Sequence, residues 1–296
     1  MMKMKRTIET AATLVLLSLL TAGKATSAFH HVIVGRGALE VQLIAAKLAD
    51  RSGDTCAIIT SSDENYIRNC RNLMYGRKND ANNDDDDDDD YKAGAKGPIF
   101  VSDSQSIGNE LDKADGLIIV CEDEAFDGVD MMMDNSPNIR HVAVLSKMGG
   151  GLRKMEESFQ SKCLMNNVAL SIVRAGILKG GGPGNVDVEG PDLGLSKFYY
   201  DSNYELGSAM VTMASDKFTL GARVTPGDPF KPPNMFAKIK SKNSFDPADT
   251  DTGRIAAAQS LLVAIQMEDG IDISLSTEKA EMPPTAEEWV DILTNI

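Results

Sequence analysis

The most constraining feature of this sequence is a repeated alternation between short apolar runs and longer amphipathic stretches. Six apolar runs follow one another between residues 31 and 174, and four of the stretches between them carry apolar side chains at helical spacing. This alternation is typical of βαβ units, in which a parallel sheet is buried between two layers of helices. We therefore predict an α/β fold with a doubly wound parallel sheet.

The predicted elements cover the chain from the first apolar run to its end. The predicted strands are residues 31–34, 55–60, 98–101, 116–121, 140–146, 168–174 and 271–275. The predicted helices are residues 39–50, 64–75, 104–111, 152–164, 252–266 and a closing helix from Thr285. Loops rich in Gly and Pro replace the alternation after Arg174. We expect a targeting segment at residues 1–28, a core at 29–178 and a small C-terminal region at 179–296, which would lie as a lid over the carboxyl ends of the strands.

The charge and cysteine content exclude several classes of site. The formal net charge is −14, and the acids are spread along most of the chain, which disfavours a nonspecific grip on nucleic-acid phosphates. The four cysteines lie far apart and form no CxxC pair, so neither a zinc site nor a disulfide framework is indicated. We expect structural thiols and no metal site. The three histidines, His30, His31 and His141, are expected at the surface or at strand edges.

A run of seven aspartates at residues 84–90 interrupts the alternation. Seven adjacent like charges repel one another and cannot be packed together, so we predict a disordered surface insertion over residues 79–97. Calcium binding is the alternative, but a calcium loop needs ligands at spaced positions on a turn with a glycine. The bare run supplies no such spacing.

The first thirty residues have the pattern of a secretory signal peptide. Lys3, Lys5 and Arg6 precede an apolar stretch at residues 11–22, and small residues follow at 25–28. About 20 apolar residues are needed to cross a bilayer as a helix, so this stretch is too short for a stable span. We expect no membrane span in the mature chain, with an uncleaved membrane anchor as the alternative.

The junction Ser27-Ala28-Phe29 bears on the compartment to which the protein is targeted. It resembles the motif at which algae with red-derived complex plastids cut a signal peptide and expose a phenylalanine for plastid import. Almost no transit peptide follows here, because an apolar run begins at His31. The resemblance implies a plastid location, with the ER lumen or secretion as alternatives.

A glycine turn joins the first predicted strand to the first predicted helix. Gly35 and Gly37 stand two residues apart, followed by Ala38 and Leu39. At such a turn the first glycine allows a tight bend, and the second lets a diphosphate approach backbone N–H groups at a helix N-terminus. The third position of the GxGxxG pattern is Glu40, where a small residue normally lets helix and strand pack closely. Dinucleotide binding and a degenerate turn that holds no cofactor therefore both stay open.

The end of the second predicted strand bears on the choice of cofactor. An acid at the tip of this strand selects NAD by binding a ribose 2′-hydroxyl, whereas here Thr60, Ser61 and Ser62 come first. Arg36 in the glycine turn is available for a 2′-phosphate, so NADP is favoured over NAD. Asp63 keeps the question open, because a shift of two residues in the strand end would reverse this preference. Other candidate cofactor contacts stand at strand ends, namely Cys121 and Arg174.

Several segments together resemble a known family. The turn at residues 34–39, the strand at 141–149 with Ser146, the helix start at 153–157, the strand at 170–176 and the tail at 271–296 are similar to the atypical short-chain dehydrogenase/reductases, the branch that includes NmrA-like and plastid NAD(P)-binding proteins. The resemblance spans nearly the whole mature chain. It implies a Rossmann sheet that binds NADP or, with lower preference, NAD, with a small C-terminal substrate or lid region.

The catalytic residues of the wider family are only partly present. Those enzymes use a serine with a Tyr-x-x-x-Lys pair, in which the tyrosine transfers the substrate proton and the lysine lowers its pKa. Ser146 matches the serine and Lys154 is the candidate lysine, but Gly150 stands where the tyrosine belongs. Three later tyrosines are candidates for the proton carrier if the fold brings one of them to the site, namely Tyr199, Tyr200 and Tyr204.

These observations leave three functions open. The first is a plastid NADP(H)-binding protein without ordinary dehydrogenase turnover, acting as a redox-responsive binding or assembly factor with a protein partner, a role carried by analogy with the family. The second is an active NADPH-dependent reductase or isomerase on a small carbonyl or isoprenoid-like substrate. The third is a structural subunit whose cleft binds no cofactor, which the glutamate at position 40 favours.

Overall fold

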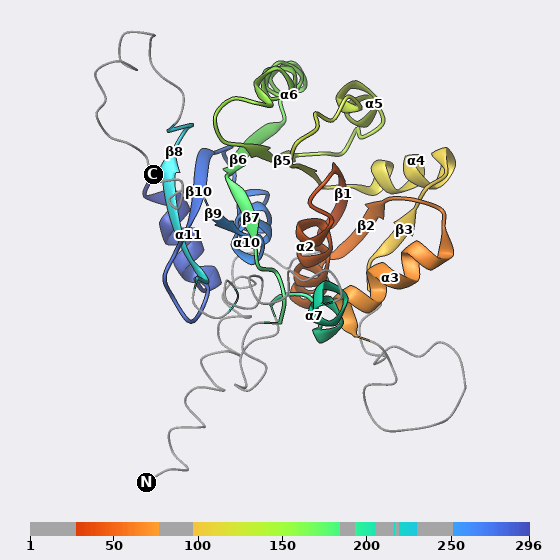
Figure 1. Ribbon diagram of the computed structural model, residues 1–296. Coiled ribbons are helices and arrows are strands. Elements are labelled where there is room, and N and C mark those ends of the chain that lie inside the picture. Colours follow the sequence, from red (N-terminus) through yellow and green to blue (C-terminus); the bar gives the residue numbers. More distant parts are fainter. Residues whose placement is uncertain (1–27, 77–96, 184–192, 205–215, 217–218, 230–250) are drawn as a thin grey trace.

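The computed structural model describes residues 28–76, 97–183, 193–204, 216, 219–229 and 251–296, and within them one large sheet organises the chain (Figure 1). The predicted signal segment and the aspartate run lie outside the described residues. The strands of the large sheet are β1 (His30–Arg36), β2 (Thr55–Ile59), β3 (Ile99–Val101), β4 (Gly116–Cys121), β5 (His141–Lys147), β6 (Ala169–Ala175), β8 (Gly221–Pro226) and β10 (Asp272–Glu278).

The strand order confirms the predicted doubly wound sheet. The order is β3-β2-β1-β4-β5-β6-β10-β8, with all neighbours parallel except β10 and β8. The chain first runs outward from β1 to β3, then returns to β4 on the other side of β1 and runs outward again. The direction of winding therefore reverses between β1 and β4. In open parallel sheets ligands bind in the crevice beyond the carboxyl ends of the strands at such a switch point.

Two hydrophobic cores lie on opposite faces of the sheet because side chains alternate along each strand. On β4, Ile118 and Val120 enter one core, while Leu117 and Ile119 enter the other. The first core contains residues of α2 (Leu39–Ser52), α3 (Glu64–Tyr75), α7 (Lys197–Tyr204), α10 (Arg254–Ala264) and α11 (Ala286–Thr294). The second contains residues of α4 (Ser104–Lys113), α5 (Val129–Asp134) and α6 (Arg153–Asn166).

Helix starts follow local capping chemistry. Asp63 and Asp103 cap α3 and α4, and each carboxylate accepts a hydrogen bond from a backbone amide in the first turn. At the last helix, Thr285 and Glu288 form a reciprocal capping box, so the predicted start at Thr285 is the N-cap of α11. These helix starts can be predicted from the sequence because the capping contacts are made between near neighbours.

The C-terminal region joins the main sheet. β10 pairs with β6, β8 pairs with β10, and α10 packs beside α2. A second sheet is formed by two short strands, β7 (Ile177–Lys179) and β9 (Asp251–Gly253). Sequence analysis missed β7, β8 and β9, because three-residue strands and an exposed edge strand carry little apolar periodicity. The division of the chain at residue 178 stays a prediction.

Two of the three histidines and all four cysteines are buried. His31 and His141 are 1% and 3% exposed, so of the two expected locations the surface is excluded for both, while His141 is the first residue of β5. His141 is accommodated because its Nε2 lies 2.8 Å from the Ser171 hydroxyl and its Nδ1 lies 3.1 Å from the Met267 carbonyl oxygen. All four cysteines are buried free thiols, and burial raises the pKa of both Cys121 and Cys163 to about 11.

The described residues contain neither a candidate membrane-spanning helix nor a candidate metal centre. None of the helices in these ranges is both long and apolar enough to cross a membrane. The same part of the chain contains no group of three or more His, Cys, Asp or Glu side chains arranged to hold a metal ion.

At Gly35 the backbone of β4 leaves no room for a side chain on β1, and substitution of this glycine tests the packing. A Cβ at residue 35 would lie 2.0 Å from the Val120 carbonyl oxygen. Because backbone must move to relieve this overlap, we expect Gly35→Ala to lower the free energy of unfolding by about 1–3 kcal/mol in urea titrations. The matched control is Gly108→Ala in α4, where nothing lies within 4 Å of the added carbon. That variant should be about 0.5–1 kcal/mol more stable, and equal stability of the two variants would contradict the close approach.

Candidate functional site

The glycine turn lies at the carboxyl end of β1, beside the switch point. Gly37 has φ +84°, and Ala38 has φ 44° and ψ 48°, so two successive residues adopt the left-handed conformation before α2 begins. No side chain caps the start of α2. This backbone has the form that a diphosphate requires, with an uncapped helix N-terminus and no side chain at the closest points of approach.

A carboxylate of the protein itself occupies part of this turn. Glu122 directly follows β4, and the Ala38 amide donates a hydrogen bond to its Oε2 at 3.1 Å. A Cβ on Gly37 would lie 3.1 Å from the Glu122 Cβ, so the glutamate is seated against the turn. The bond shows that the Ala38 amide faces an anion. It also means that a phosphate oxygen gains this amide only when Glu122 leaves.

The next two acids hold the same loop across the crevice. We call residues 122–124, Glu-Asp-Glu, the acidic loop. Asp123 pairs with Lys147 at the end of β5, and Glu124 Oε2 lies 3.7 Å from Arg36 in the glycine turn. Both pairs are largely exposed and contribute little stability by themselves. Together with Glu122 they attach the acidic loop to the carboxyl ends of both β1 and β5.

Glu40, which weakened the glycine pattern, does not fill the turn. Its carboxylate lies 3.7 Å from Arg254 Nε at the start of α10. The turn is instead supported by Gln42, whose Nε2 donates to the Gly37 carbonyl at 3.0 Å. Leu39, the last predicted contact of this turn, is the first residue of α2 and packs on the core beside Ala38. The missing third glycine is therefore compatible with a formed turn.

The hydroxyl residues directly follow the carboxyl end of β2, while the nearby acid is engaged elsewhere. β2 ends at Ile59, and Thr60, Ser61 and Ser62 form the connection to α3. Asp63 Oδ1 accepts from the Asn65 amide at 2.9 Å as the helix cap. The acid that left the cofactor preference open is thus part of α3 and not the tip of the strand.

Ser146 belongs to a buried polar cluster that joins four elements. Its hydroxyl donates to Glu156 Oε1 at 2.5 Å, and Arg174 donates to the same carboxylate, with Nη2 2.8 Å from Oε2 and Nε 3.1 Å from Oε1. Arg174 also pairs with Asp272 on β10. Ser146, Glu156 and Arg174 are each no more than 5% exposed. We call these four residues the arginine cluster.

The arginine cluster fixes the state of Ser146. Burial alone would lower the pKa of Arg174, but the hydrogen bonds and charges of Glu156 and Asp272 outweigh it and raise that pKa, so the guanidinium stays charged. Its bidentate bond holds the Glu156 carboxylate in position to accept the Ser146 proton. A hydroxyl that donates to its own protein cannot at the same time donate to a substrate oxygen.

The structure does not bring Lys154 to Ser146. Lys154 is exposed on the first turn of α6, and with Gly150 it lines a hollow of about 560 Å³ whose lining does not include Ser146. Gly150 has φ +79°, a conformation that a tyrosine rarely adopts. Cys121 lies beside Arg36 in the register of β4 and β1, with its thiol buried. Of the predicted site residues, those of the glycine turn thus lie together, whereas Ser146 and Lys154 are separated.

The later tyrosines are engaged on another part of the fold. Tyr199 donates to the Gly180 carbonyl at 3.3 Å, and Tyr200 donates to the Asp216 carboxylate at 2.9 Å. Both lie on α7, which packs against α3 and is well separated from α6 in Figure 1. The side chain of Tyr204 lies outside the described residues. Neither described tyrosine replaces the missing proton carrier at Ser146.

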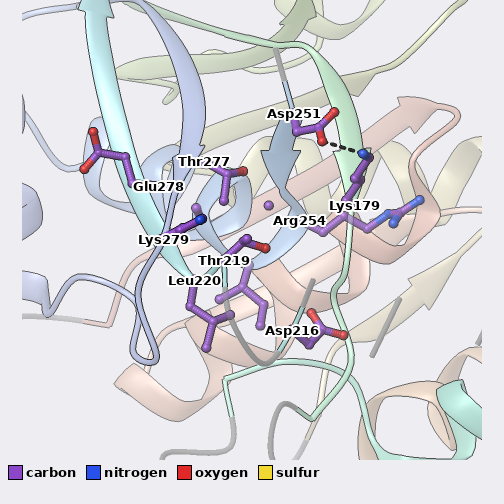
Figure 2. Close-up of a pocket in the computed structure, with 12 residues that line it drawn as sticks. Lys179, Asp216, Thr219, Leu220, Asp251, Arg254, Thr277, Glu278 and Lys279 are labelled. Carbon is purple, nitrogen blue, oxygen red and sulfur yellow. Dashed lines mark hydrogen bonds and ion pairs between the residues drawn. The ribbon is translucent and has the colours of Figure 1, made fainter. Parts of the chain in front are cut away.

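Asp216 forms a second place where a carboxylate binds backbone amides. It accepts from Gly181 N at 2.6 Å and from Gly182 N at 2.8 Å, and it is 2% exposed. Burial raises its pKa, and these amide bonds partly offset that shift. Figure 2 shows Asp216 at one end of a cavity of about 290 Å³, with the Lys179–Asp251 ion pair at another side.

Sequence analysis missed three acids that decide the character of the site. Glu122 stands one residue after a predicted strand, and the rule that ligands bind at carboxyl ends of strands was enough to place it at the crevice. Glu156 lies two residues after the candidate lysine, but nothing local shows that it faces Ser146. Asp272 gave no signal, because its partner Arg174 is 98 residues away in the chain.

Breaking the arginine cluster tests whether it carries stability. Glu156→Gln removes the charge that Arg174 faces in a buried site, so we expect the free energy of unfolding to fall by about 3 kcal/mol in urea titrations. The matched control is Glu157→Gln, which makes the same change at the exposed neighbour and should stay within about 0.5 kcal/mol of wild type. Equal effects of the two variants would contradict the assigned role of Glu156.

No protein-family model matches this chain, and no curated protein matches its sequence. Similar solved structures include the UDP-N-acetylglucosamine 4-epimerase of Bacillus cereus, with 10% identity, coverage of 90% of this chain and 84% of that chain, and a TM-score of 0.40. The UDP-glucose 4-epimerase of Brucella ovis, solved in complex with NAD, has 11% identity, coverage of 88% and 81%, and a TM-score of 0.44. A short-chain dehydrogenase of Streptomyces avermitilis has 12% identity, coverage of 92% and 93%, and a TM-score of 0.36. The strand order, and not these distant similarities, establishes the fold class of this chain.

Proposed function

We propose that this protein is an atypical member of the short-chain dehydrogenase/reductase type that binds NADP(H) without ordinary dehydrogenase turnover, and that it acts as a nucleotide-responsive binding or assembly factor. The observation that carries the proposal is the hydrogen bond from Ser146 to Glu156 within the arginine cluster. It removes the hydroxyl that such an enzyme directs at its substrate, while the glycine turn remains formed.

The backbone of the glycine turn has the form that suits a diphosphate, and its Ala38 amide donates to the carboxylate of Glu122. Gly35 and Gly37 give the approach, and the amides of Ala38 and Leu39 at the start of α2 would hold the phosphates. The nicotinamide of a bound cofactor supplies hydride chemistry in proteins of this type. In this chain Glu122 competes for the Ala38 amide, so we expect weak binding that strengthens when the glutamate is neutral or displaced.

The preference for NADP over NAD rests on two features of the rim. The strand end at Ile59 is followed by Thr60, Ser61 and Ser62, and Asp63 is engaged as a helix cap. Arg36 is 60% exposed and is paired only loosely with Glu124, so it is available for a 2′-phosphate.

The acidic loop gives nucleotide binding a route to a change of shape. A phosphate that takes the Ala38 amide displaces Glu122, and the pairs of Asp123 with Lys147 and Glu124 with Arg36 lie on the same short loop. Displacement of Glu122 would therefore change the positions of all three acids of the acidic loop at the surface. A partner protein that binds this loop would distinguish the nucleotide-bound form from the free form. We place this activity in the plastid, supported by the Ser27-Ala28-Phe29 junction.

Nucleotide binding is tested by removing the competing charge. Glu122→Gln should lower the Kd for NADPH about tenfold, because a charge-assisted bond worth about 1.5–3 kcal/mol no longer competes for the amide. The matched control is Asp123→Asn, which removes one charge from the same loop without touching Ala38 or Arg36 and should change the Kd less. Isothermal titration with NADPH and NADH checks both variants, with NADPH binding more tightly. Absence of binding to wild type and to both variants would favour a structural subunit without a cofactor.

The absence of turnover is tested separately. A panel of quinones, aldehydes and enones with NADPH should show hydride transfer at least about 100-fold slower than an enzyme with a positioned general acid, because that acid contributes roughly 10²–10⁴ in rate. Absorbance of NADPH is the measurement. Rapid turnover that Tyr199→Phe or Tyr200→Phe abolishes would support the alternative, an active reductase or isomerase, and would contradict the proposal.

A further inference from the structure

Phe29, immediately before β1, is held at both of its backbone ends. Its nitrogen donates to Asp54 Oδ1 at 3.0 Å, and its carbonyl oxygen accepts from the Thr55 amide at 2.9 Å. Its ring stacks on His31, with the ring centroids 6.1 Å apart and the planes inclined by 15°. The nitrogen of Phe29 is therefore fixed beside the carboxylate, whatever precedes it in the chain.

Asp54 is a partly buried carboxylate whose one basic side-chain partner among the described residues is a histidine. Its side chain is 11% exposed, and its contacts are the Phe29 nitrogen and His31 Nε2, the latter at 3.3 Å. Within the described ranges, no lysine or arginine pairs with it. Withdrawing a carboxylate from water costs free energy, which a positive charge beside it offsets.

His31 provides the other contact of Asp54. The ring is 1% exposed, and its Nε2 lies 3.3 Å from Asp54 Oδ2. Its Nδ1 is a buried atom that lies against Gly116, where even a Cβ would come within 2.9 Å of it. The ring is therefore held in place beside the carboxylate.

We propose that hydrolysis of the Ala28–Phe29 peptide bond makes Phe29 the first residue of the mature protein, and that its new α-ammonium group forms an ion pair with Asp54. A signal-peptidase-type protease would catalyse the step, with water as the second reactant. Water adds across the bond: residues 1–28 leave with a carboxylate on Ala28, and the Phe29 nitrogen keeps its electron pair and gains protons to become an ammonium. Ala28 is exposed, and the residues before the bond are small.

The reaction places a positive charge at an atom that already contacts Asp54. The Phe29 N–H already donates to a carboxylate, and a positive charge on the same nitrogen adds a Coulomb attraction to that bond, so we expect the cut chain to be more stable. An α-amino group has an ordinary pKa of about 7.7–8.0, and a neighbouring carboxylate raises it. The advantage is then full below about pH 7.7 and is lost as the pH rises through the raised value. This inference does not rest on nucleotide binding, and it shares the Ser27-Ala28-Phe29 junction with the proposed location.

The test compares two chain starts with and without the carboxylate. All described helices and strands lie after residue 28, so chains starting at Phe29 and at Ala28 keep the whole described fold. At pH 6.5 the chain starting at Phe29 should melt about 3 °C higher than the chain starting at Ala28, the shift expected of about 1 kcal/mol in a protein of this size. Asp54→Asn should abolish the difference. The matched control is Asp115→Asn, since Asp115 accepts from the next amide, His30 N, at 3.1 Å. The difference between the two starts should persist in that variant.

The other ionisable side chains at this end of the sheet are present in both chains, namely His30, His31, Asp50, Cys56, Glu110, Lys113 and Asp115. The chain that starts at Ala28 carries its own α-ammonium group one residue before the nitrogen that contacts Asp54, so the comparison measures the direct contact. The full chain expressed in secretory cells should yield a product with the intact mass of residues 29–296. A mature start at another residue, equal melting of the two chains, or a difference that survives Asp54→Asn would each overturn the proposal.

Discussion

The buried guanidinium of Arg174 is the constraint around which the second half of the sheet is arranged. A charge at 5% exposure must be matched by nearby carboxylates, and these come from α6 and from β10, elements far apart in the sequence. The resulting cluster ties β5, β6, α6 and β10 together. It also consumes the Ser146 hydroxyl as a donor to Glu156. The same contacts that stabilise this part of the fold therefore remove a group that dehydrogenase chemistry would need.

Carboxylates of the chain bind backbone amides at several functionally suggestive places. Glu122 accepts from Ala38 at the glycine turn, Asp216 accepts from two amides of the glycine-rich loop after β7, and Asp54 accepts from Phe29 before β1. In a chain with a net charge of −14 these acids are not simply a solvated surface. At the glycine turn the consequence is direct, because an incoming phosphate and Glu122 compete for one N–H group.

Much of the fold was predictable because its signals are local. The strand at Gly116–Cys121 and the helix at Glu64–Tyr75 were predicted with the bounds that the structure has, since an unbroken apolar run and a capped helix are defined by neighbouring residues. The candidate site was harder. Glu40, which stands where a small residue normally packs, lies beside Arg254 and leaves the turn formed, and that pairing joins residues 214 positions apart. The acid that does reach the turn, Glu122, follows a different strand.

The sequence by itself determined the order and type of most elements, the glycine turn and the absence of a tyrosine four residues before Lys154, because each depends on residue identity and short spacing. Only the tertiary structure decided which acid faces the turn, that Ser146 donates to Glu156, and that Asp54 lies beside the Phe29 nitrogen. The physical reason is that burial and charge pairing arise between side chains brought together by the sheet, and a linear pattern does not record which distant carboxylate will meet which donor.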